Sequence, residues 1–393
     1  MRFALPRTLA GCGGAPAEVN APTTAPSAAP APAVSAAPST SAATPKPPTD
    51  PVRAAAEKAL SCKWEDGEPD WDCAESKAWD DLDALREGKA DATLVAMLGE
   101  SDARLVYLAA KALSHTGDKY RFDKALAEKT LVKLEGPLPP KTQVLVAEVA
   151  GAIDTKETGF GDRMLAISQK LPIPSRIAFV RSAQFRNSDF FFASTAALAK
   201  SEPDEKLREA AIRAFWTGTP SDKGEEVCEL WTGIAEDPKT PDVLGGMAAD
   251  FAAWTNMQPC VKHFDRILAR LDKRMKAGSL EAWDWPNVAE HLAGNQAASP
   301  AQRKKAVAAL KSMAENAKNW TSARSTSARA LLFVELPTGK AVLAKFAKDK
   351  DVNVQKIAKD LENDVKEAEK HAEQKKADEK KAAGKPAEKK PKK

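Results

Sequence analysis

The sequence predicts an all-α protein built as an α-solenoid of stacked helical hairpins, and three observations support this fold class. From about residue 74 to residue 364, apolar residues recur at helical spacing, and no convincing stretch alternates as a β-strand would. The breaks between helical segments carry a capping residue followed by proline, as at Thr240-Pro241 and Ser299-Pro300. In addition, one helical segment occurs twice.

The repeated segment is Leu105–Leu113 in one copy and Leu207–Phe215 in the other, and the two align without a gap. Each copy follows an aspartate, Asp102 or Asp204, and an apolar segment before that. Each also carries adjacent alanines that let neighbouring helices approach closely while larger apolar residues fill the seam: Ala109, Ala110, Ala210 and Ala211.

This pattern resembles the HEAT repeat, whose second helix typically carries Asp, then Val-Arg, then paired alanines and a closing Ala-Leu. Fainter copies are Asp351–Ala358 and Ser327–Leu332. The resemblance implies a solenoid in which each hairpin buries its apolar face only by stacking on the next. The alternative is an irregular all-α domain whose alanine-rich helices are alike by chance.

Composition divides the chain into four parts. Residues 1–12 form a signal-like segment, 13–50 a spacer of Pro, Ala, Ser and Thr, 51–364 the helical-repeat domain, and 365–393 a Lys-rich tail. The spacer buries too little to offset the entropy of ordering, so we expect it to be disordered. The tail is expected to start as a helix and to end as a disordered coil. No run of about 18 apolar residues predicts a transmembrane helix.

The signal-like segment ends in Leu9-Ala10-Gly11-Cys12. These residues resemble a bacterial lipobox, in which small residues precede a cysteine that is acylated and becomes the mature N-terminus. The resemblance implies a lipid on Cys12 that tethers the chain to a membrane. The apolar region before it is broken by Pro6, whereas a signal peptide has about 7–15 apolar residues. Either the true start codon lies upstream, or the match to a lipobox is due to chance.

Setting Cys12 aside leaves an even number of cysteines: Cys62, Cys73, Cys228 and Cys260. In an oxidising compartment, four cysteines suit two disulfides with three possible pairings. We favour the sequence-local pairing, Cys62–Cys73 and Cys228–Cys260, in which each bond adds roughly 3–4 kcal/mol through loop entropy. Four buried thiols in a cytosolic protein are the alternative. No CxxC occurs, which disfavours a zinc ribbon.

The loop between Cys62 and Cys73 carries acidic residues at alternate positions, which raises the question of calcium: Asp66, Glu68, Asp70 and Asp72. An EF-hand requires glycine at the sixth loop position, where this loop has Trp71. We therefore expect a solvated acidic loop, closed by a disulfide and packed through Trp64, Trp71 and Trp79.

No catalytic motif is found. None of the four histidines lies in a His-Glu-x-x-His motif or beside a Ser or Cys nucleophile: His115, His263, His291 and His371. We expect His263, on a predicted helix, to lie at the surface. The sequence therefore predicts a non-enzymatic protein with no catalytic residue, metal, cofactor or small-molecule substrate. A repeat-fold enzyme would need a pocket with convergent carboxylates and a perturbed pKa.

Two tryptophans are candidate binding residues. Trp283 and Trp285 are two positions apart, so they face different sides of a helix and cannot easily both be buried. Tryptophan is over-represented at interface hot spots, so one of them is a candidate anchor for a partner. Packing in the core is the alternative.

The charge is uneven along the chain. From Lys366 onward eleven lysines face six acidic residues, which accounts for the whole net charge of +4. The rest is close to neutral, so no large basic nucleic-acid surface is expected on the folded part. The tail would meet anionic lipid or cell-wall polymer, or serve only to solubilise the chain.

These observations predict a lipid-anchored scaffold of a bacterial cell envelope that binds a protein or cell-wall partner through its helical surface. Its membrane contact would come from the N-terminal lipid, and no nucleic acid is expected. The alternative is a cytoplasmic helical-repeat adaptor or nucleic-acid-associated protein that uses the Lys-rich tail.

Overall fold

The structure of the chain is a computed structural model. It describes residues 50–82, 91–114, 123–154, 158–183, 189–218, 222–254, 258–278, 280 and 284–383. The signal-like segment 1–12, the spacer up to residue 49 and the last ten residues of the tail lie outside the described residues. All described residues fall within one compact unit, Thr49–Lys393.

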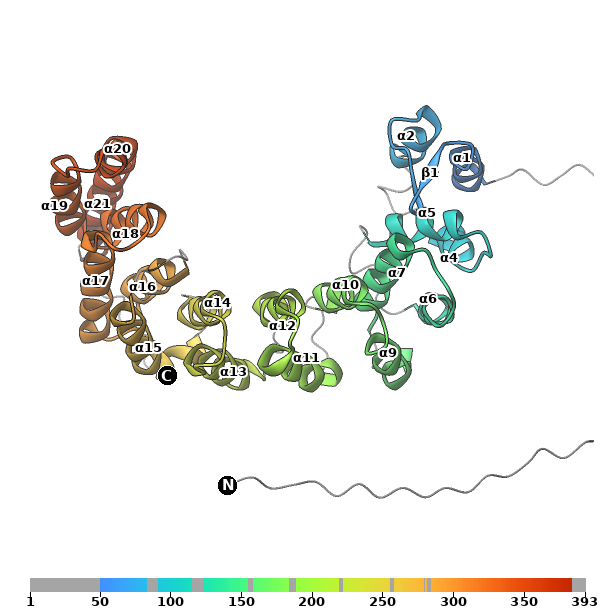
Figure 1. Ribbon diagram of the computed structural model, residues 1–393, viewed down its shortest axis with the longest axis horizontal. Coiled ribbons are helices and arrows are strands. Elements are labelled where there is room, and N and C mark those ends of the chain that lie inside the picture. The colour runs from blue at the N-terminus through green and yellow to red at the C-terminus, as the bar shows by residue number, and fades with distance from the viewer. Residues whose placement is uncertain are drawn as a thin grey trace, which may run out of the picture. The chain divides into compact units, whose positions relative to one another are not determined.

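The described part is all-α, as predicted, apart from one small hairpin (Figure 1). The helices up to residue 201 are α1 (Pro51–Ala59), α2 (Ala74–Asp80), α4 (Asp91–Leu98), α5 (Ala103–Ser114), α6 (Lys124–Glu135), α7 (Pro140–Ala152), α9 (Gly161–Ser168), α10 (Ile173–Ala183) and α11 (Asp189–Ser201). They are followed by α12 (Glu205–Gly218), α13 (Gly224–Glu236), α14 (Asp242–Ala253), the 3-10 helix η2 (Gln258–His263), α15 (Phe264–Lys276), α16 (Asp284–Gly294), α17 (Pro300–Glu315), α18 (Thr321–Val334), α19 (Leu336–Phe346), α20 (Val352–Asp360) and α21 (Glu362–Ala383).

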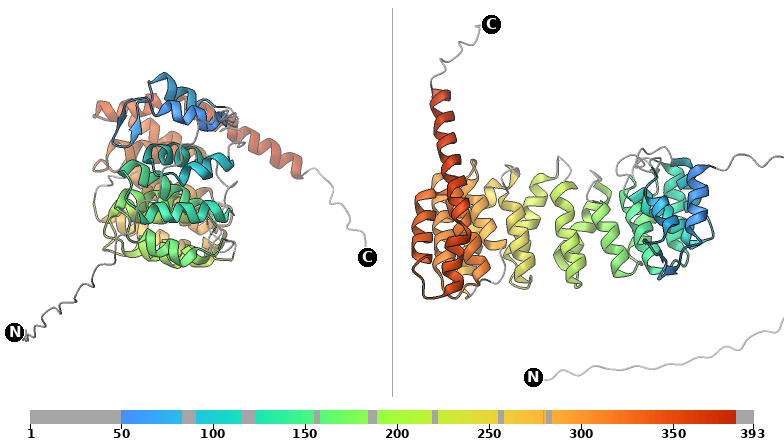
Figure 2. Two further views of the ribbon diagram at one scale, coloured as in Figure 1. Left: turned by 90° about the vertical axis from the view of Figure 1, so that its right-hand side faces the viewer. Right: turned by 90° about the horizontal axis from the view of Figure 1, so that it is seen from above.

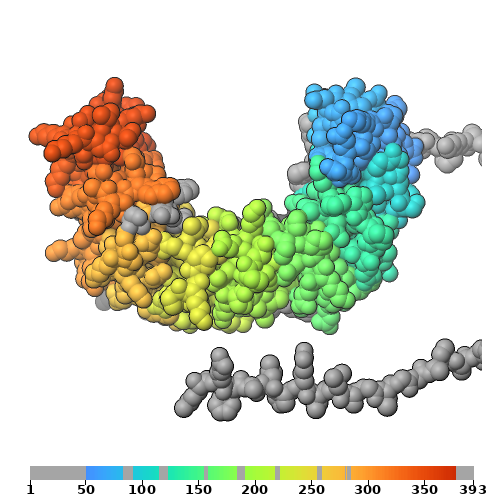
Figure 3. Space-filling model, viewed as in Figure 1, coloured from blue at the N-terminus to red at the C-terminus, as the bar shows by residue number. Residues whose placement is uncertain are grey.

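From α4 to α18 the helices alternate between two rows (Figure 1). The first row holds α4, α6, α9, α11, α13, α15 and α17, and the second row holds α5, α7, α10, α12, α14, α16 and α18. Most neighbours within a row contact each other, and several consecutive helices also pack across the rows. Figure 2 shows the helices lying side by side, and Figure 3 shows side chains closing the space between successive pairs. The predicted stacking of helical hairpins is therefore confirmed.

The two aligned sequence segments form equivalent second-row helices, α5 and α12. Their four central alanines are at most 1% exposed, as close helix packing requires: Ala109, Ala110, Ala210 and Ala211. The preceding aspartates cap the helices, because Asp204 Oδ1 accepts the backbone N–H of Leu207 at 2.9 Å and Asp102 accepts that of Arg104 at 2.9 Å.

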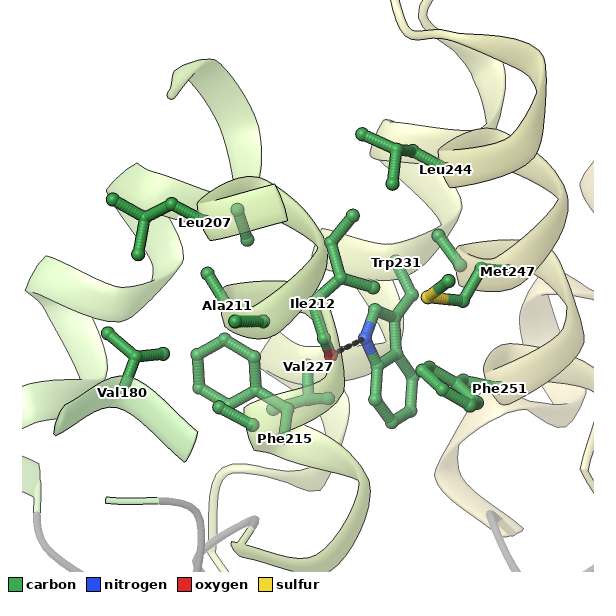
Figure 4. Close-up of a cluster of buried hydrophobic side chains, with 14 of the residues drawn as sticks. Val180, Leu207, Ala211, Ile212, Phe215, Val227, Trp231, Leu244, Met247 and Phe251 are labelled. Atoms are coloured by element: carbon green, nitrogen blue, oxygen red, sulfur yellow. Dashed lines mark hydrogen bonds between the residues drawn. The ribbon is translucent and has the colours of Figure 1, made fainter. Parts of the chain in front are cut away.

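The core between hairpins is filled by large side chains, of which Trp231 is an example (Figure 4). Trp231 lies on α13 and is fully buried beside Phe251 of α14, with ring centroids 5.4 Å apart. Its indole Nε1 donates to the carbonyl oxygen of Ile212 on α12 at 3.2 Å. One buried ring thus joins three successive helices and satisfies its own polar atom, as buried tryptophans usually do.

A buried arginine ties the end of one helix to the next pair. Arg208 of α12 is only 8% exposed, and its Nε donates to the carbonyl oxygen of Ala199, in the last turn of α11, at 3.0 Å. A second guanidinium nitrogen donates to Thr240 Oγ1 at 2.8 Å, in the turn before α14. We expected Thr240 to cap α14, but Pro241 is the N-cap residue because the Thr240 hydroxyl is engaged with Arg208.

The same device recurs further along the array. Arg324 of α18 is 6% exposed and donates to the carbonyl oxygen of Ala314, in the last turn of α17, at 3.0 Å. It also reaches Asp349, beyond α19, at 3.4 Å. By contrast, Ser299 caps α17 as expected, since it forms a capping box with Gln302.

The four cysteines that the structure describes lie in two pairs at disulfide distance, in the pairing that the sequence favours. Cys62 joins Cys73, with Cα atoms 6.0 Å apart, and Cys228 joins Cys260, with Cα atoms 5.1 Å apart. The first pair closes the acidic loop near the N-terminal end of the unit. The second connects α13 to η2 and so closes the loop of chain that contains α14.

The acidic loop contains the only strands in the described part, which the sequence analysis did not predict. β1 (Trp64–Glu65) pairs antiparallel with β2 (Glu68–Pro69). The turn between them is Asp66-Gly67, with φ angles of 52° and 84°, the left-handed conformation favoured by an Asp-Gly hairpin turn. As expected, the loop packs through tryptophans: Trp79 is buried, and Trp64 and Trp71 flank the ring of Tyr107.

The helix at the start of the Lys-rich tail covers more than half of the tail. α21 extends to Ala383, and an ion pair between Arg329 and Asp364, at 2.7 Å, holds its first turn against α18. No helix in the described part combines the length and the apolar character needed to cross a membrane.

We expect R208A to lower the free energy of unfolding by about 1–3 kcal/mol, because it leaves a buried carbonyl and hydroxyl without a donor. R213A is the matched control on the same helix: Arg213 is exposed and, within the described part, pairs only with Glu209, so its loss should cost less than about 0.5 kcal/mol. Urea unfolding followed by circular dichroism would measure both. Equal effects of the two variants would contradict the role given to Arg208.

Gly151 of α7 permits a close approach between two second-row helices. A Cβ atom at this position would overlap the carbonyl oxygen of Phe179 on α10 and the Cβ of Ser182. Gly233 of α13, by contrast, has open space where its Cβ would lie.

We therefore expect G151A to destabilise the protein by about 1–3 kcal/mol through overpacking. G233A should instead stabilise it by about 0.5–1 kcal/mol, because alanine costs less entropy in a helix. Thermal unfolding of the two variants would show shifts of opposite sign. If G151A were as stable as the parent protein, the close packing of α7 on α10 would be contradicted.

Candidate binding site on the second row

The predicted tryptophan anchors are not both available to a partner. Trp285, on α16, is fully buried in the core, which corrects its assignment as a binding residue: its ring is taken up by packing. Trp283 lies outside the described residues. The tryptophan that is exposed among the described residues is Trp320, the N-cap residue of α18, which is 57% exposed.

A depression between first-row helices α15 and α17 is a second feature of the surface. It has a volume of about 740 Å³, and its lining includes Leu268, Met275 and Ala308. Two carboxylates, Asp265 and Asp272, contribute from α15, and Lys305 contributes from α17. It is a gap between splayed helices without a convergent set of polar groups.

The most distinctive group of side chains lies on the C-terminal halves of the second-row helices. We call it the second-row cluster, and it comprises Trp216, Asp250, Trp254, Glu290, His291 and Arg329. Trp216 comes from α12, Asp250 from α14 and Trp254 follows it, Glu290 and His291 come from α16, and Arg329 comes from α18. All but Arg329 are partly buried, and Arg329 is exposed.

The aromatic side of the cluster is a row of edge-to-face contacts. The Trp254 ring meets the Trp216 ring at a centroid distance of 4.7 Å and an angle of 85°. It also meets the His291 ring at 4.3 Å and 75°. Trp216 also stacks on Phe251 at 4.7 Å, so the rings hold one another in place.

The ionic side of the cluster is built on a histidine–aspartate pair. His291 Nδ1 lies 2.8 Å from Asp250 Oδ1, and the two side chains are 19% and 17% exposed. Both atoms are buried, and neither forms a hydrogen bond in the described part of the chain, so the two groups approach closely without hydrogen-bond geometry.

Glu290 is the carboxylate with the perturbed ionisation. Burial raises the pKa of Glu290, the negative charge of Asp250 acts in the same direction, and the charges of His291 and Arg329 oppose them. Arg329 is itself paired with Asp364 at 2.7 Å. Among the described residues no donor forms a hydrogen bond with Glu290, so its charge is only indirectly compensated.

The cluster therefore gathers tryptophan rings, two carboxylates, an imidazole and a guanidinium along one row of helices, a composition suited to polar and charged recognition. The sequence analysis missed it because members on successive second-row helices are 34–41 residues apart, about one hairpin repeat. The sequence did carry a signal for the cluster. Polar residues recur near the C-terminal end of successive second-row helices, beside positions that are apolar.

The prediction for His263 needs a correction. His263 is only 6% exposed rather than a surface residue, because η2 turns it under α13, where its Nδ1 lies 3.5 Å from Glu229. Burial lowers the pKa of His263, so the imidazole is neutral at pH 7. Its Nε2 has no hydrogen-bond partner in the described part. His115 lies outside the described residues, and His371 is exposed on α21.

Comparison of the chain with protein families, with curated proteins and with solved structures finds no match. The fold and the cluster therefore define the protein by class alone: an array of helical hairpins with two cysteine pairs and a half-buried ionic cluster on one row.

We expect E290Q to unfold at a higher temperature than the parent protein at pH 7. The raised pKa means that ionising Glu290 is harder in the folded than in the unfolded state, so its charge reduces stability above that pKa. The difference should vanish below about pH 4, where the carboxyl is protonated in both states.

E229Q provides a matched control of opposite sign. The hydrogen bond from Arg266 lowers the pKa of Glu229, so its charge adds stability at neutral pH, by at most about 1 kcal/mol for so exposed a pair. Differential scanning fluorimetry between pH 3 and pH 8 would follow both variants. A destabilised E290Q at pH 7 would show that Glu290 is well compensated.

Proposed function

We propose that the protein is a non-enzymatic scaffold of a bacterial cell envelope, anchored by lipid at Cys12, which binds a protein or cell-wall partner along the second row of helices. The proposal is supported first by the sequence Leu9-Ala10-Gly11-Cys12 and the spacer of residues 13–50, which resemble a lipobox and its leash. A spacer of this composition would let a folded domain reach away from a bilayer.

The cysteine pairs support the extracytoplasmic part of the proposal. Every described cysteine lies at disulfide distance from another, and disulfides persist in oxidising compartments but are rare in the cytosol. The count fits the lipidation proposal as well, because Cys12 is the one cysteine left over.

The array supports the scaffold part of the proposal. Stacked hairpins of the kind that resemble HEAT repeats present long rows of helices, and such rows serve as extended binding surfaces. The observation that carries the binding role is the second-row cluster, in which half-buried charges and tryptophans are displayed at the surface where only packing would be needed for stability.

The decisive test of the anchor is the intact mass of the protein purified from its native membrane fraction. We expect cleavage before Cys12, an added mass of several acyl chains and the loss of four hydrogens from Cys62, Cys73, Cys228 and Cys260. C12A should remain unacylated and leave the membrane fraction. An unprocessed N-terminus with four free thiols in the cytosol would instead favour a cytoplasmic adaptor that uses the Lys-rich tail.

The binding role is tested by photocrosslinking in intact cells. A photoreactive residue replacing exposed Arg213 or Arg329 would probe the second row, and one replacing exposed Glu226 or Lys311 would probe the first row. We expect a discrete crosslinked product from the second-row positions only. Equal labelling of both rows, or of neither, would contradict partner binding through the second row.

A further inference from the structure

Three potential metal ligands meet at the Cys62–Cys73 pair. The carboxylate oxygen Oε2 of Glu75 lies 3.1 Å from Cys73 Sγ and 4.0 Å from Cys62 Sγ. The two sulfurs and this oxygen all lie within 4.8 Å of one another, and no other group of three His, Cys, Asp or Glu ligand atoms does so in the described part of the chain. Because the three residues are 11 and 2 positions apart, they match no metal-binding sequence motif. Only the folded loop brings them together.

The backbone holds the two cysteines in place without the sulfur bond. The N–H of Cys62 donates to the carbonyl oxygen of Ala59, at the end of α1, at 3.2 Å. The N–H of Cys73 donates to the carbonyl oxygen of Asp70 at 3.2 Å, and the N–H of Asp70 donates to that of Lys63 at 2.8 Å. We therefore expect the two Cα atoms, 6.0 Å apart, to stay close when the disulfide is open.

Side-chain contacts fix the loop to the array as well. Trp64 meets the ring of Tyr107, on α5, edge-on at a centroid distance of 5.8 Å. Glu68 accepts a hydrogen bond from Trp71 Nε1 at 3.0 Å and forms an ion pair with Lys141 of α7. None of these contacts involves sulfur, so a reduced loop keeps its two thiols side by side.

The donor set determines which metal suits the loop. Two thiolates and one carboxylate suit Zn²⁺, which binds sulfur at about 2.3 Å and carboxylate oxygen at about 2.0–2.2 Å in a tetrahedral arrangement. That geometry separates the two sulfurs by about 3.8 Å, which is within reach of neighbouring cysteine side chains once the S–S bond is broken. Ca²⁺ and Mg²⁺ are disfavoured because they prefer oxygen ligands alone.

The loop is open to a cation and attracts one. Cys73 is partly exposed and Glu75 is exposed, whereas Cys62 is buried. Residues 62–75 carry six acidic side chains and one lysine, and a negative field of this kind concentrates cations. A water molecule would complete the fourth coordination position.

We propose that the Cys62–Cys73 pair, once reduced, binds a zinc ion together with Glu75, so that the loop is closed either by a disulfide or by a metal. Reduction by a dithiol supplies two electrons and two protons: the S–S bond breaks, two thiols form, and the dithiol becomes a disulfide. Zinc then displaces both thiol protons into water as the Zn–S bonds form. The site is independent of the second row and goes beyond the proposed function.

The other cysteine pair, Cys228 and Cys260, is an internal control. Both residues are fully buried, and no third ligand atom joins them among the described residues. Reduction of this pair therefore creates two thiols without a carboxylate, and no zinc site is expected there.

The test uses the full-length chain carrying C12A, so that the two cysteine pairs supply all of its thiols. The disulfides are reduced with a phosphine, which becomes a phosphine oxide by taking the oxygen of a water molecule. The chain is then titrated with Zn²⁺ against a chromogenic chelator. We expect one zinc ion per reduced chain and none per oxidised chain. With Co²⁺ as the probe, the reduced chain should show a thiolate-to-cobalt charge-transfer band.

E75Q keeps both cysteines and should weaken zinc binding about tenfold or more, because a neutral amide replaces a charged ligand. E65Q is the matched control in the same loop: Glu65 is exposed and pairs with Lys63, so its loss should change the affinity by about twofold or less. C62S combined with C73S should abolish the zinc site and the cobalt band, whereas C228S combined with C260S should leave both unchanged.

Circular dichroism of each reduced variant separates loss of the site from loss of the fold. Weaker zinc binding by E75Q with the helical signal of the parent chain would support the inference. A reduced parent chain that binds no zinc, full affinity in E75Q, or loss of zinc only when Cys228 and Cys260 are replaced would overturn it.

Discussion

The array depends on satisfying the carbonyl groups at the ends of many short helices. Each helix leaves its last four carbonyl oxygens without an intrahelical partner, and stacking buries these ends between hairpins. Buried or partly buried cationic side chains resolve this: Arg208 reaches the last turn of α11, Arg324 that of α17, Arg270 that of α13 and Lys129 that of α4. A positive charge is also favoured at a helix C-terminus by the helix dipole.

This constraint also fixes the register in which successive hairpins stack. The cation on one helix can reach a neighbouring helix end only if the helices stack in a fixed register, so each bond specifies the position of the next hairpin. Arg208 and Arg324 extend the link to the turn beyond, through Thr240 and Asp349. Packing of small residues such as Gly151 then sets how close the rows approach.

The same register places the C-terminal halves of the second-row helices next to one another, and this creates the second-row cluster. Asp250 and His291 belong to different hairpins, and they meet because α14 and α16 are neighbours in the row. The stacking thus accounts for where the cluster lies but not for which residues form it. Tryptophans, carboxylates and a histidine occupy places where the array needs only helix-compatible residues.

The sequence by itself determined the helical class, the repeated alanine-rich helices and the capping box at Ser299, because helical period, small residues and capping chemistry are local properties. It also indicated the pairing of the cysteines, because the favoured partners are close in sequence. The Asp66-Gly67 hairpin turn was readable from the same local chemistry and was overlooked. Only the tertiary structure decided which residues face one another: that Trp285 and His263 are buried, that Thr240 serves Arg208, and that Glu290 lies beside Asp250 and His291. These outcomes depend on contacts between hairpins, and no local pattern encodes which side chains from separate repeats come together.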